Sequence, residues 1–130
     1  MRAIDTHVLL RLITRDDARQ AAAADHFVAR GAWVSVLALA ETAWVLSTVL
    51  ELSADEVAAS VRMLLDHEHL AIQDSDAVEA ALARFRNRPR LGFSDCLLLE
   101  LARKAGHLPL GTFDRDLSRL DGAEKLPSFP

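Results

Sequence analysis

Short apolar stretches alternate along the chain with longer stretches in which hydrophobic residues recur at helical spacing. The apolar stretches at 3–4, 33–36, 70–73 and 108–112 predict short buried strands. Helical periodicity predicts helices over 7–13, 16–29, 37–50, 53–67, 75–87, 94–105 and 114–120. Short strands separated by helices are typical of an α/β fold with a parallel sheet.

Several helix boundaries carry their own chemical signals. The sequence Ser-Ala-Asp-Glu at 53–56 is a capping box, which predicts a helix start at this point. Ser94 or Asp95 is expected to cap a helix that stops at Gly106. The segment 37–50 is apolar on nearly every side, which predicts a buried helix.

The length and composition fit one globular domain spanning 1–130, because 51% of the 130 residues are hydrophobic and 26% are charged. The formal net charge of −4 argues against a protein that binds nucleic acid through an overall positive charge. It does not argue against an enzyme that binds a phosphodiester through metal ions. A single cysteine, Cys96, excludes an intramolecular disulfide and favours the cytoplasm. No apolar run is long enough to span a membrane, and Asp5 argues against a signal peptide.

Five acidic residues lie outside the solvated helix faces that hold most of the acids. Asp5 closes the first apolar stretch, and Glu41 interrupts the apolar segment 37–50. Asp95 precedes an apolar run, and Asp114 and Asp116 follow the last predicted strand. Helix capping is an alternative role for Asp5, Asp95 and Asp114. Glu41 lacks that alternative, and a carboxylate in an apolar helix needs an ion-pair partner or a metal.

These acids are expected to converge, because the carboxyl ends of parallel strands share one edge of a sheet. Asp5 and Asp114 follow strands, Asp95 is at a helix start, and Glu41 lies one to two turns beyond the second strand. Clustered carboxylates repel one another unless a cation is present. Oxygen ligands without His or Cys favour Mg²⁺ or Mn²⁺, so the sequence predicts a site for one or two of these ions.

The segments that carry these acids resemble the motifs of PIN-domain ribonucleases. They are Ile4-Asp5-Thr6, Ala40-Glu41, Phe93-Ser94-Asp95-Cys96-Leu97 and Thr112-Phe113-Asp114-Arg115-Asp116. The resemblance is closest to VapC-type toxins of bacterial toxin–antitoxin pairs and extends from Met1 to about Leu120. His7 departs from the family pattern, which usually has Asn there. The resemblance implies a PIN-domain-like three-layer α/β/α sandwich with a short, mainly parallel central sheet.

The resemblance also implies the chemistry. Asp5, Glu41, Asp95 and Asp114 would be catalytic and bind Mg²⁺ or Mn²⁺, with Asp116 as an extra acid found in some members. Thr112 would form hydrogen bonds within the acidic cluster, and Thr6 would do likewise or cap a helix. The implied reaction is endonucleolytic hydrolysis of single-stranded or loop RNA. The implied partners are an antitoxin and a second copy of the chain, in the cytoplasm.

Four arginines, Arg84, Arg86, Arg88 and Arg90, occur within seven residues. Arginine matches the geometry of phosphate, so these residues are predicted to bind RNA; a solvated helix end is the alternative.

Other side chains of interest have simpler interpretations. Trp33 and Trp44 are predicted to lie in the core, with a dimer face as the alternative. His7 is expected to form a local hydrogen bond at a helix start, the alternative being a contact with substrate or metal. Cys96 is expected to pack as a small apolar residue.

Three other functions stay open from the sequence. The first is a PIN-like RNA-processing nuclease without an antitoxin. The second is a receiver-like phosphoacceptor domain that binds Mg²⁺, although Thr6 stands where such a domain would have a second acid after Asp5. The third is a binding module that has lost its activity, against which the intact acids argue.

Overall fold

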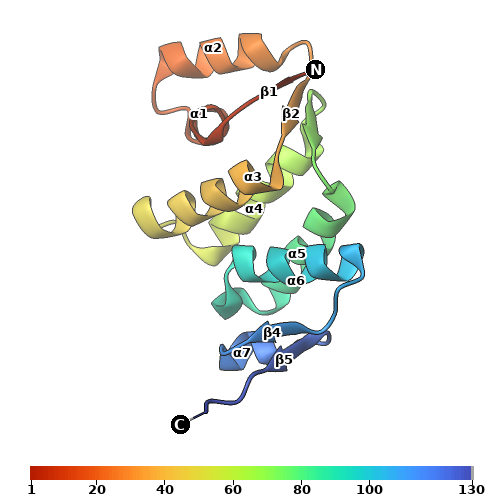
Figure 1. Ribbon diagram of the computed structural model, residues 1–130. Coiled ribbons are helices and arrows are strands. Elements are labelled where there is room, and N and C mark those ends of the chain that lie inside the picture. The colour runs from red at the N-terminus through yellow and green to blue at the C-terminus, as the bar shows by residue number, and fades with distance from the viewer. Residues whose placement is uncertain (130) are drawn as a thin grey trace. The chain divides into compact units, whose positions relative to one another are not determined.

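The computed structural model describes residues 1–129, which contain seven α-helices and five short strands (Figure 1). The chain divides into two compact units, Met1–Ser75 and Asp76–Pro130. None of the helices within residues 1–129 has the length and apolar character needed to cross a lipid bilayer.

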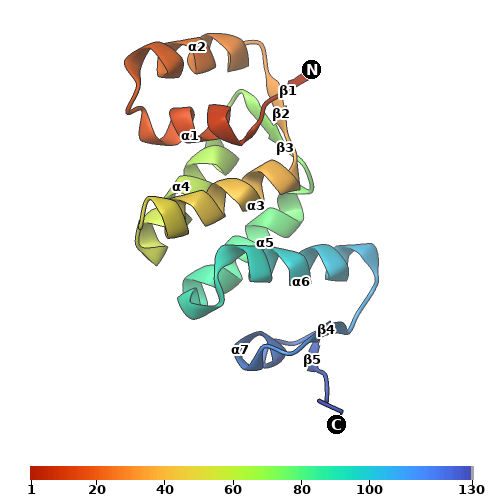
Figure 2. The same cartoon turned by 60° about the vertical axis from the view of Figure 1, so that its left-hand side comes forward.

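The first unit is built on a three-stranded parallel sheet with the strand order β1-β2-β3. Figure 2 shows the three strands side by side. In chain order the unit contains β1 (Arg2–Ala3), α1 (Thr6–Thr14), α2 (Ala18–Val28), β2 (Ala32–Val34), α3 (Val36–Trp44), the π-helix η1 (Val45–Val49), α4 (Ala54–Asp66) and β3 (Leu70–Ile72). The capping box predicted at 53–56 is confirmed at the start of α4.

The strand register places two helix starts at one edge of this sheet. Arg2 pairs with Ala32, and beyond β1 the Ile4 N–H still donates to the carbonyl of Trp33 at 3.1 Å. The chain then leaves both strands, so that Asp5 begins α1 and Ser35 begins α3 as N-caps. Because the two strands are adjacent and parallel, these caps belong to the same edge.

α1 packs against α2 and α3 through an apolar face. Leu9 and Leu12 of α1 are buried, and Thr6 at the start of the helix continues the same row at a spacing of three. Leu39 of α3 and Leu46 of η1 are fully enclosed. Burying side chains of this size stabilises the fold by about 1.5–3 kcal/mol each, which fixes the position of α1 relative to α3.

The second unit has a two-stranded parallel sheet, in which β4 pairs with β5. Its elements are α5 (Ser75–Asn87), the 3-10 helix η2 (Pro89–Leu91), α6 (Phe93–Ala105), β4 (Leu110–Thr112), α7 (Arg115–Ser118) and β5 (Ala123–Lys125). The short helix α7 packs on both strands. Gly106 ends α6 at φ 82°, a left-handed conformation that glycine adopts without strain, as the sequence predicts.

A buried carboxylate links α5 to α6. Glu100 of α6 is only 6% exposed, and its Oε2 lies 3.4 Å from Arg103 Nε and 3.7 Å from Arg84 Nε. The two guanidinium groups compensate the loss of water around the charge. Arg84 therefore has a structural partner within its own unit.

The prediction of an α/β fold with short parallel strands is confirmed, but the strands form two sheets rather than the single sheet expected. The strand at 108–112 does not extend the first sheet; β4 pairs with β5 instead. The strand β5 has the sequence Ala-Glu-Lys, which carries no apolar alternation, so the pattern of the sequence did not reveal it.

The prediction of one buried helix over 37–50 is also wrong. α3 ends at Trp44 and continues as a π-helix, in which the Leu50 N–H donates to the Val45 carbonyl at 3.0 Å. Leu37 is 75% exposed and Trp44 is 57% exposed, while Trp33 of β2 is 40% exposed, so the tryptophans lie outside the core. Packing covers only one face of α3, and the apolar residues on the opposite face remain in solvent.

Candidate active site

Asp5 is exposed and acts as the N-cap of α1. Its Oδ1 accepts a hydrogen bond from the Val8 N–H at 3.1 Å, whereas Oδ2 has no hydrogen-bond partner within residues 1–129. The capping interaction fixes the side chain and leaves one oxygen available, so capping and metal binding are compatible roles. The adjacent Thr6 is buried, and among the described residues its hydroxyl forms no hydrogen bond.

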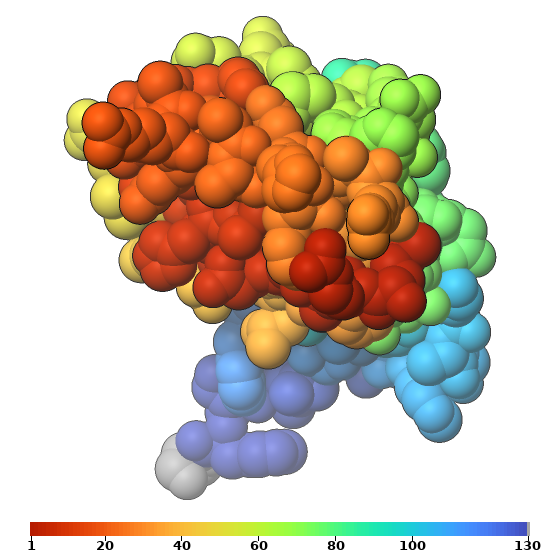
Figure 3. Space-filling model, turned by 90° about the horizontal axis from the view of Figure 1, so that it is seen from above, coloured from red at the N-terminus to blue at the C-terminus, as the bar shows by residue number. Residues whose placement is uncertain are grey.

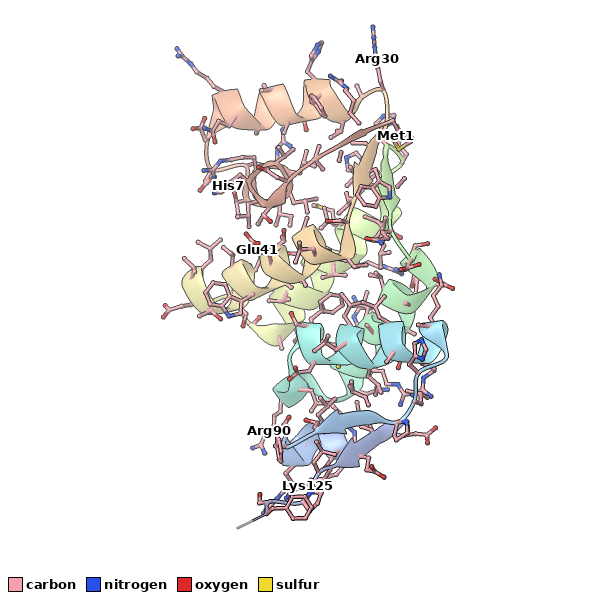
Figure 4. The ribbon with its side chains drawn as sticks, viewed as in Figure 1. Met1, His7, Arg30, Glu41, Arg90 and Lys125 are labelled. Atoms are coloured by element: carbon pink, nitrogen blue, oxygen red, sulfur yellow. The ribbon has the colours of Figure 1, made fainter. Side chains whose placement is uncertain are left out.

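Glu41 is exposed on α3, which corrects the expectation of a buried carboxylate. No ion pair or hydrogen bond of Glu41 occurs within the part of the chain that the structure describes. Leu37 and Trp44 lie four residues before it and three residues after it, which puts all three side chains on one helix face. Glu41 therefore lies between two exposed apolar side chains, and Figure 4 labels it on α3.

Asp95 lies in the first turn of α6 and is half-buried. The cap of this helix is Gly92 rather than Ser94 or Asp95, which corrects the capping assignment made from the sequence. Partial burial and, to a smaller extent, the negative charge of Asp114 raise the pKa of the Asp95 carboxyl above its ordinary value. The surroundings of Asp95 thus disfavour its ionised carboxylate, and no capping role explains why an acid occupies this position.

Asp114 is an exposed residue that connects β4 to α7. Its Oδ2 accepts a hydrogen bond from the Leu117 N–H at 3.3 Å, and its own N–H donates to Thr112 Oγ1 at 3.0 Å. The hydroxyl of Thr112 therefore orients the turn that presents Asp114. Cys96, next to Asp95, is buried as expected, and burial raises its thiol pKa to about 11, which leaves little thiolate at neutral pH.

Two of the four predicted arginines, Arg88 and Arg90, line a pocket in the second unit together with Asp116. Its lining comprises Asn87, Arg88, Pro89, Arg90, Leu91, Asp116 and Arg119. Asp116 Oδ1 lies 4.0 Å from Arg119 Nη1, and both side chains are exposed. The sequence did not single out Arg119, because it is far along the chain from the 84–90 cluster; its spacing of three from Asp116 was the available signal.

The structure brings the predicted acids together in part. Asp95 and Asp114 lie close enough to interact electrostatically within the second unit. Asp5 and Glu41 belong to two helices that pack together in the first unit. Within residues 1–129, no group of three or more His, Cys, Asp or Glu side chains is positioned to hold a metal ion. The donor chemistry of these acids, carboxylate oxygen alone, fits Mg²⁺ or Mn²⁺.

His7 is exposed on α1, and it forms no hydrogen bond within residues 1–129. The local hydrogen bond expected for His7 from the sequence is therefore not formed, so its ring is available to a ligand (Figure 4).

Comparison with known proteins gives one family. The family model described as PIN domain matches residues 3–123, a range that includes all five candidate acids. Curated proteins and solved structures give no match.

Proposed function

Because the chain belongs to the PIN domain family, whose members are generally metal-dependent nucleases, we propose that it is an endoribonuclease dependent on Mg²⁺ or Mn²⁺. The family match confirms the fold class expected from the sequence and indicates a nuclease. The match continues across both compact units, which supports a single functional domain over residues 1–130.

We assign Asp5, Glu41, Asp95 and Asp114 to binding one or two divalent cations. The support is their donor chemistry and the raised pKa of Asp95, since a nearby cation would stabilise its ionised form. When bound, such an ion would activate water for attack on a phosphodiester. Asp116 stays a prediction as a further ligand, because its observed neighbour is Arg119.

The chain's own groups would hold this arrangement in place. The Val8 N–H fixes one oxygen of Asp5, and Thr112 Oγ1 with the Leu117 N–H orients Asp114. Carboxylates held by hydrogen bonds at helix starts lose little rotational freedom when they bind a ligand. An ionised carboxylate among them is also able to accept a proton from the attacking water.

For RNA binding we propose the pocket lined by Arg88, Arg90 and Arg119, together with the exposed Arg86. Guanidinium groups donate two parallel hydrogen bonds to a phosphate, which suits the RNA backbone. Arg84 is the weakest of the predicted RNA contacts, because it already pairs with the buried Glu100.

We further propose that the nuclease is a VapC-type toxin that acts in the cytoplasm with a cognate antitoxin. The exposed face of α3 supports this role, because Leu37 and Trp44 flank the free carboxylate of Glu41. An antitoxin segment with an arginine between apolar side chains would complement that face. We also propose a homodimer, for which Val49, Leu50 and Met63 provide other exposed apolar side chains of the first unit.

Incubation of the purified protein with labelled RNA tests the enzymatic part of the proposal. Cleavage is expected with Mn²⁺ or Mg²⁺ and should stop with EDTA. The Asp5→Asn, Glu41→Gln, Asp95→Asn and Asp114→Asn variants should each lose it. Asp55→Asn is the matched control, because Asp55 is an exposed acid in the first turn of α4. Full cleavage by any of the four variants would show that its carboxylate is not required.

Co-expression separates a toxin from an RNA-processing nuclease. A toxin should arrest growth when expressed alone, and a small protein encoded directly upstream should restore growth. Asp95→Asn should be harmless in the same assay. An active nuclease that leaves growth unaffected, with no such upstream partner, would favour RNA processing.

A further inference from the structure

A pocket of about 420 Å³ lies between α1 and α2, directly beside Asp5. Val8 of α1 and Ala23 and Phe27 of α2 give it mainly apolar walls. Figure 3 shows the face of the first unit on which α1 and α2, coloured red to orange, adjoin each other. The volume is in the range of pockets that bind small ligands, and the small side chain of Ala23 keeps it open.

Polar groups at the edge of the pocket are free to bind a ligand. His7 and Gln20 both line it. Arg11 Nε donates a hydrogen bond to Gln20 Oε1, which joins α1 to α2 and fixes the amide of Gln20. Arg11 Nη1 also donates to Asp16 Oδ1 at 2.8 Å. Within residues 1–129 the amide nitrogen of Gln20 and the ring of His7 have no hydrogen-bond partner. The pocket therefore combines apolar walls with uncommitted donors and acceptors.

The aromatic wall of the pocket is held in place by Arg2. The guanidinium carbon of Arg2 lies 3.7 Å from the centre of the Phe27 ring, and Arg2 Nη2 donates to the Phe27 carbonyl at 3.5 Å. A cation stacked on an aromatic ring restricts the motion of the ring. Phe27 is thus a fixed part of the pocket wall, and Arg2 covers one face of its ring.

We propose that this pocket binds one unstacked base of the RNA substrate, next to the bond that is cleaved. This inference rests on the proposed function, because Asp5 links the pocket to the cleaved phosphate. A base has apolar faces that match the walls and polar edges that match His7 and Gln20. Proteins recognise single-stranded RNA by stacking splayed bases on aromatic side chains and binding their edges. The apolar walls and the polar edge of the pocket together match an unpaired base. Paired RNA, whose bases are enclosed in a helix, would therefore be a poor substrate.

Filling the pocket provides the central test. Ala23 is exposed and lines the pocket, so Ala23→Leu occupies its space without entering the core. Ala22 is an exposed neighbour on the same helix that does not line the pocket, which makes Ala22→Leu the matched control. Both variants replace Ala with Leu, and both of these residue types favour helices. A difference between the two variants therefore reports an effect on the pocket rather than on helix stability.

The first measurement is independent of catalysis. The four nucleoside 5′-monophosphates, with ribose 5-phosphate as the ligand without a base, are titrated in EDTA while NMR follows the rings of His7 and Phe27. Nucleotides should shift both rings in the wild type and in Ala22→Leu, and Ala23→Leu should weaken their binding about tenfold. Ribose 5-phosphate should leave the rings unchanged. Equal shifts with ribose 5-phosphate, or equal binding by the two variants, would overturn the proposal.

The second measurement uses cleavage. Once the cleaved bond is mapped, oligonucleotides with one abasic nucleotide at each flanking position are compared with the intact RNA. One abasic position should lower kcat/KM about tenfold for the wild type and Ala22→Leu, but have little further effect on Ala23→Leu. Equal losses in all three proteins would contradict a base pocket. If the protein bound nucleotides at His7 and Phe27 but never cleaved RNA, the proposed nuclease function would be refuted, whereas binding of a base in the pocket would not.

Discussion

Asp95 and Asp114 are electrostatically coupled in the second unit: partial burial raises the pKa of the Asp95 carboxyl, and the negative charge of Asp114 raises it further. An ionised Asp95 is therefore less favourable in the folded protein than in the unfolded chain. Two carboxylates in this relationship are a ready arrangement for a cation, since a cation would remove both penalties.

The raised pKa of Asp95, caused mainly by burial, predicts a pH-dependent stability difference for Asp95→Asn. An acid with a raised pKa binds more protons in the folded state, so folded stability falls as pH rises from the ordinary value of 3.8 through the raised value. Asn stays neutral and avoids this loss. In EDTA, the melting temperature of Asp95→Asn relative to the wild type should therefore increase between about pH 4 and 7.

Thermal unfolding at several pH values measures this difference. Asp116→Asn is the matched control, because it removes an exposed acid from the same unit. A constant difference between Asp95→Asn and the wild type across the pH range would mean that Asp95 ionises as freely in the folded chain as in the unfolded one.

Divalent cations should stabilise the folded protein. An ion that binds only the folded state at about 100 times its Kd adds about 2.7 kcal/mol. For a chain of 130 residues this corresponds to a rise in Tm of about 5–10 °C. Differential scanning fluorimetry with Mn²⁺ and Mg²⁺ measures it, and Asp95→Asn should reduce the rise while Asp55→Asn retains it. An unchanged Tm in the wild type at saturating Mn²⁺ would argue against the metal site.

Substituting Arg88 and Arg90 together should weaken RNA binding and its salt dependence. Each phosphate contact to a single strand contributes about 0.7 to the slope of log K against log salt, so losing two should lower the slope by about 1.4. Binding titrations at several salt concentrations, with an inactive Asp95→Asn background, give this slope. The control is the double variant Arg19→Ala with Arg30→Ala, which removes two exposed arginines of the first unit and should change the slope little. Figure 4 labels Arg30 at the end of α2. An unchanged slope in the first pair would exclude it from the phosphate contacts.

Arg84→Ala should instead lower stability. It removes one of two guanidinium groups near the buried Glu100 and leaves Arg103 as the remaining one, at a cost of about 1–2 kcal/mol. Urea denaturation measures this loss. If Arg84→Ala were as stable as the wild type but bound RNA weakly, Arg84 would contact the substrate rather than stabilise the fold.

The candidate acids stand out in the sequence because a carboxylate is unusual in their local apolar patterns. Asp5 and Asp114 stand where strands give way to helices, and the structure finds both as N-caps, a role that the sequence had left open. The place of Asp95 in its helix could not be predicted, because the start of α6 depends on Gly92 adopting φ 76° rather than on a capping side chain.

Exposure was harder to predict than secondary structure. The segment 37–50 is apolar almost throughout, and hydrophobicity alone does not say which face of such a helix is covered. Ala38 and Leu39 are buried, whereas Leu37 and Trp44 face solvent. The pocket beside Asp5 was also invisible in the sequence, because it depends on how α1 and α2 pack and on the small size of Ala23.

The exposed face of α3 leads to a prediction that separates the two proposed protein partners. Trp44→Ser removes the largest exposed apolar side chain beside Glu41 and should weaken inhibition by the cognate antitoxin at least about tenfold, because buried tryptophans often dominate binding energy at interfaces. It should leave the homodimer intact. Val49→Ser with Leu50→Ser should have the opposite effect, shifting the protein toward monomers while retaining inhibition.

Inhibition of RNA cleavage by added antitoxin and sedimentation velocity measure the two properties separately. Leu98→Ser is the control for both, because Leu98 is an apolar side chain of α6 that is 56% exposed. If Trp44→Ser instead produced monomers with unaltered inhibition, the face around Glu41 would belong to the dimer, and the antitoxin would have to reach the acids by another surface.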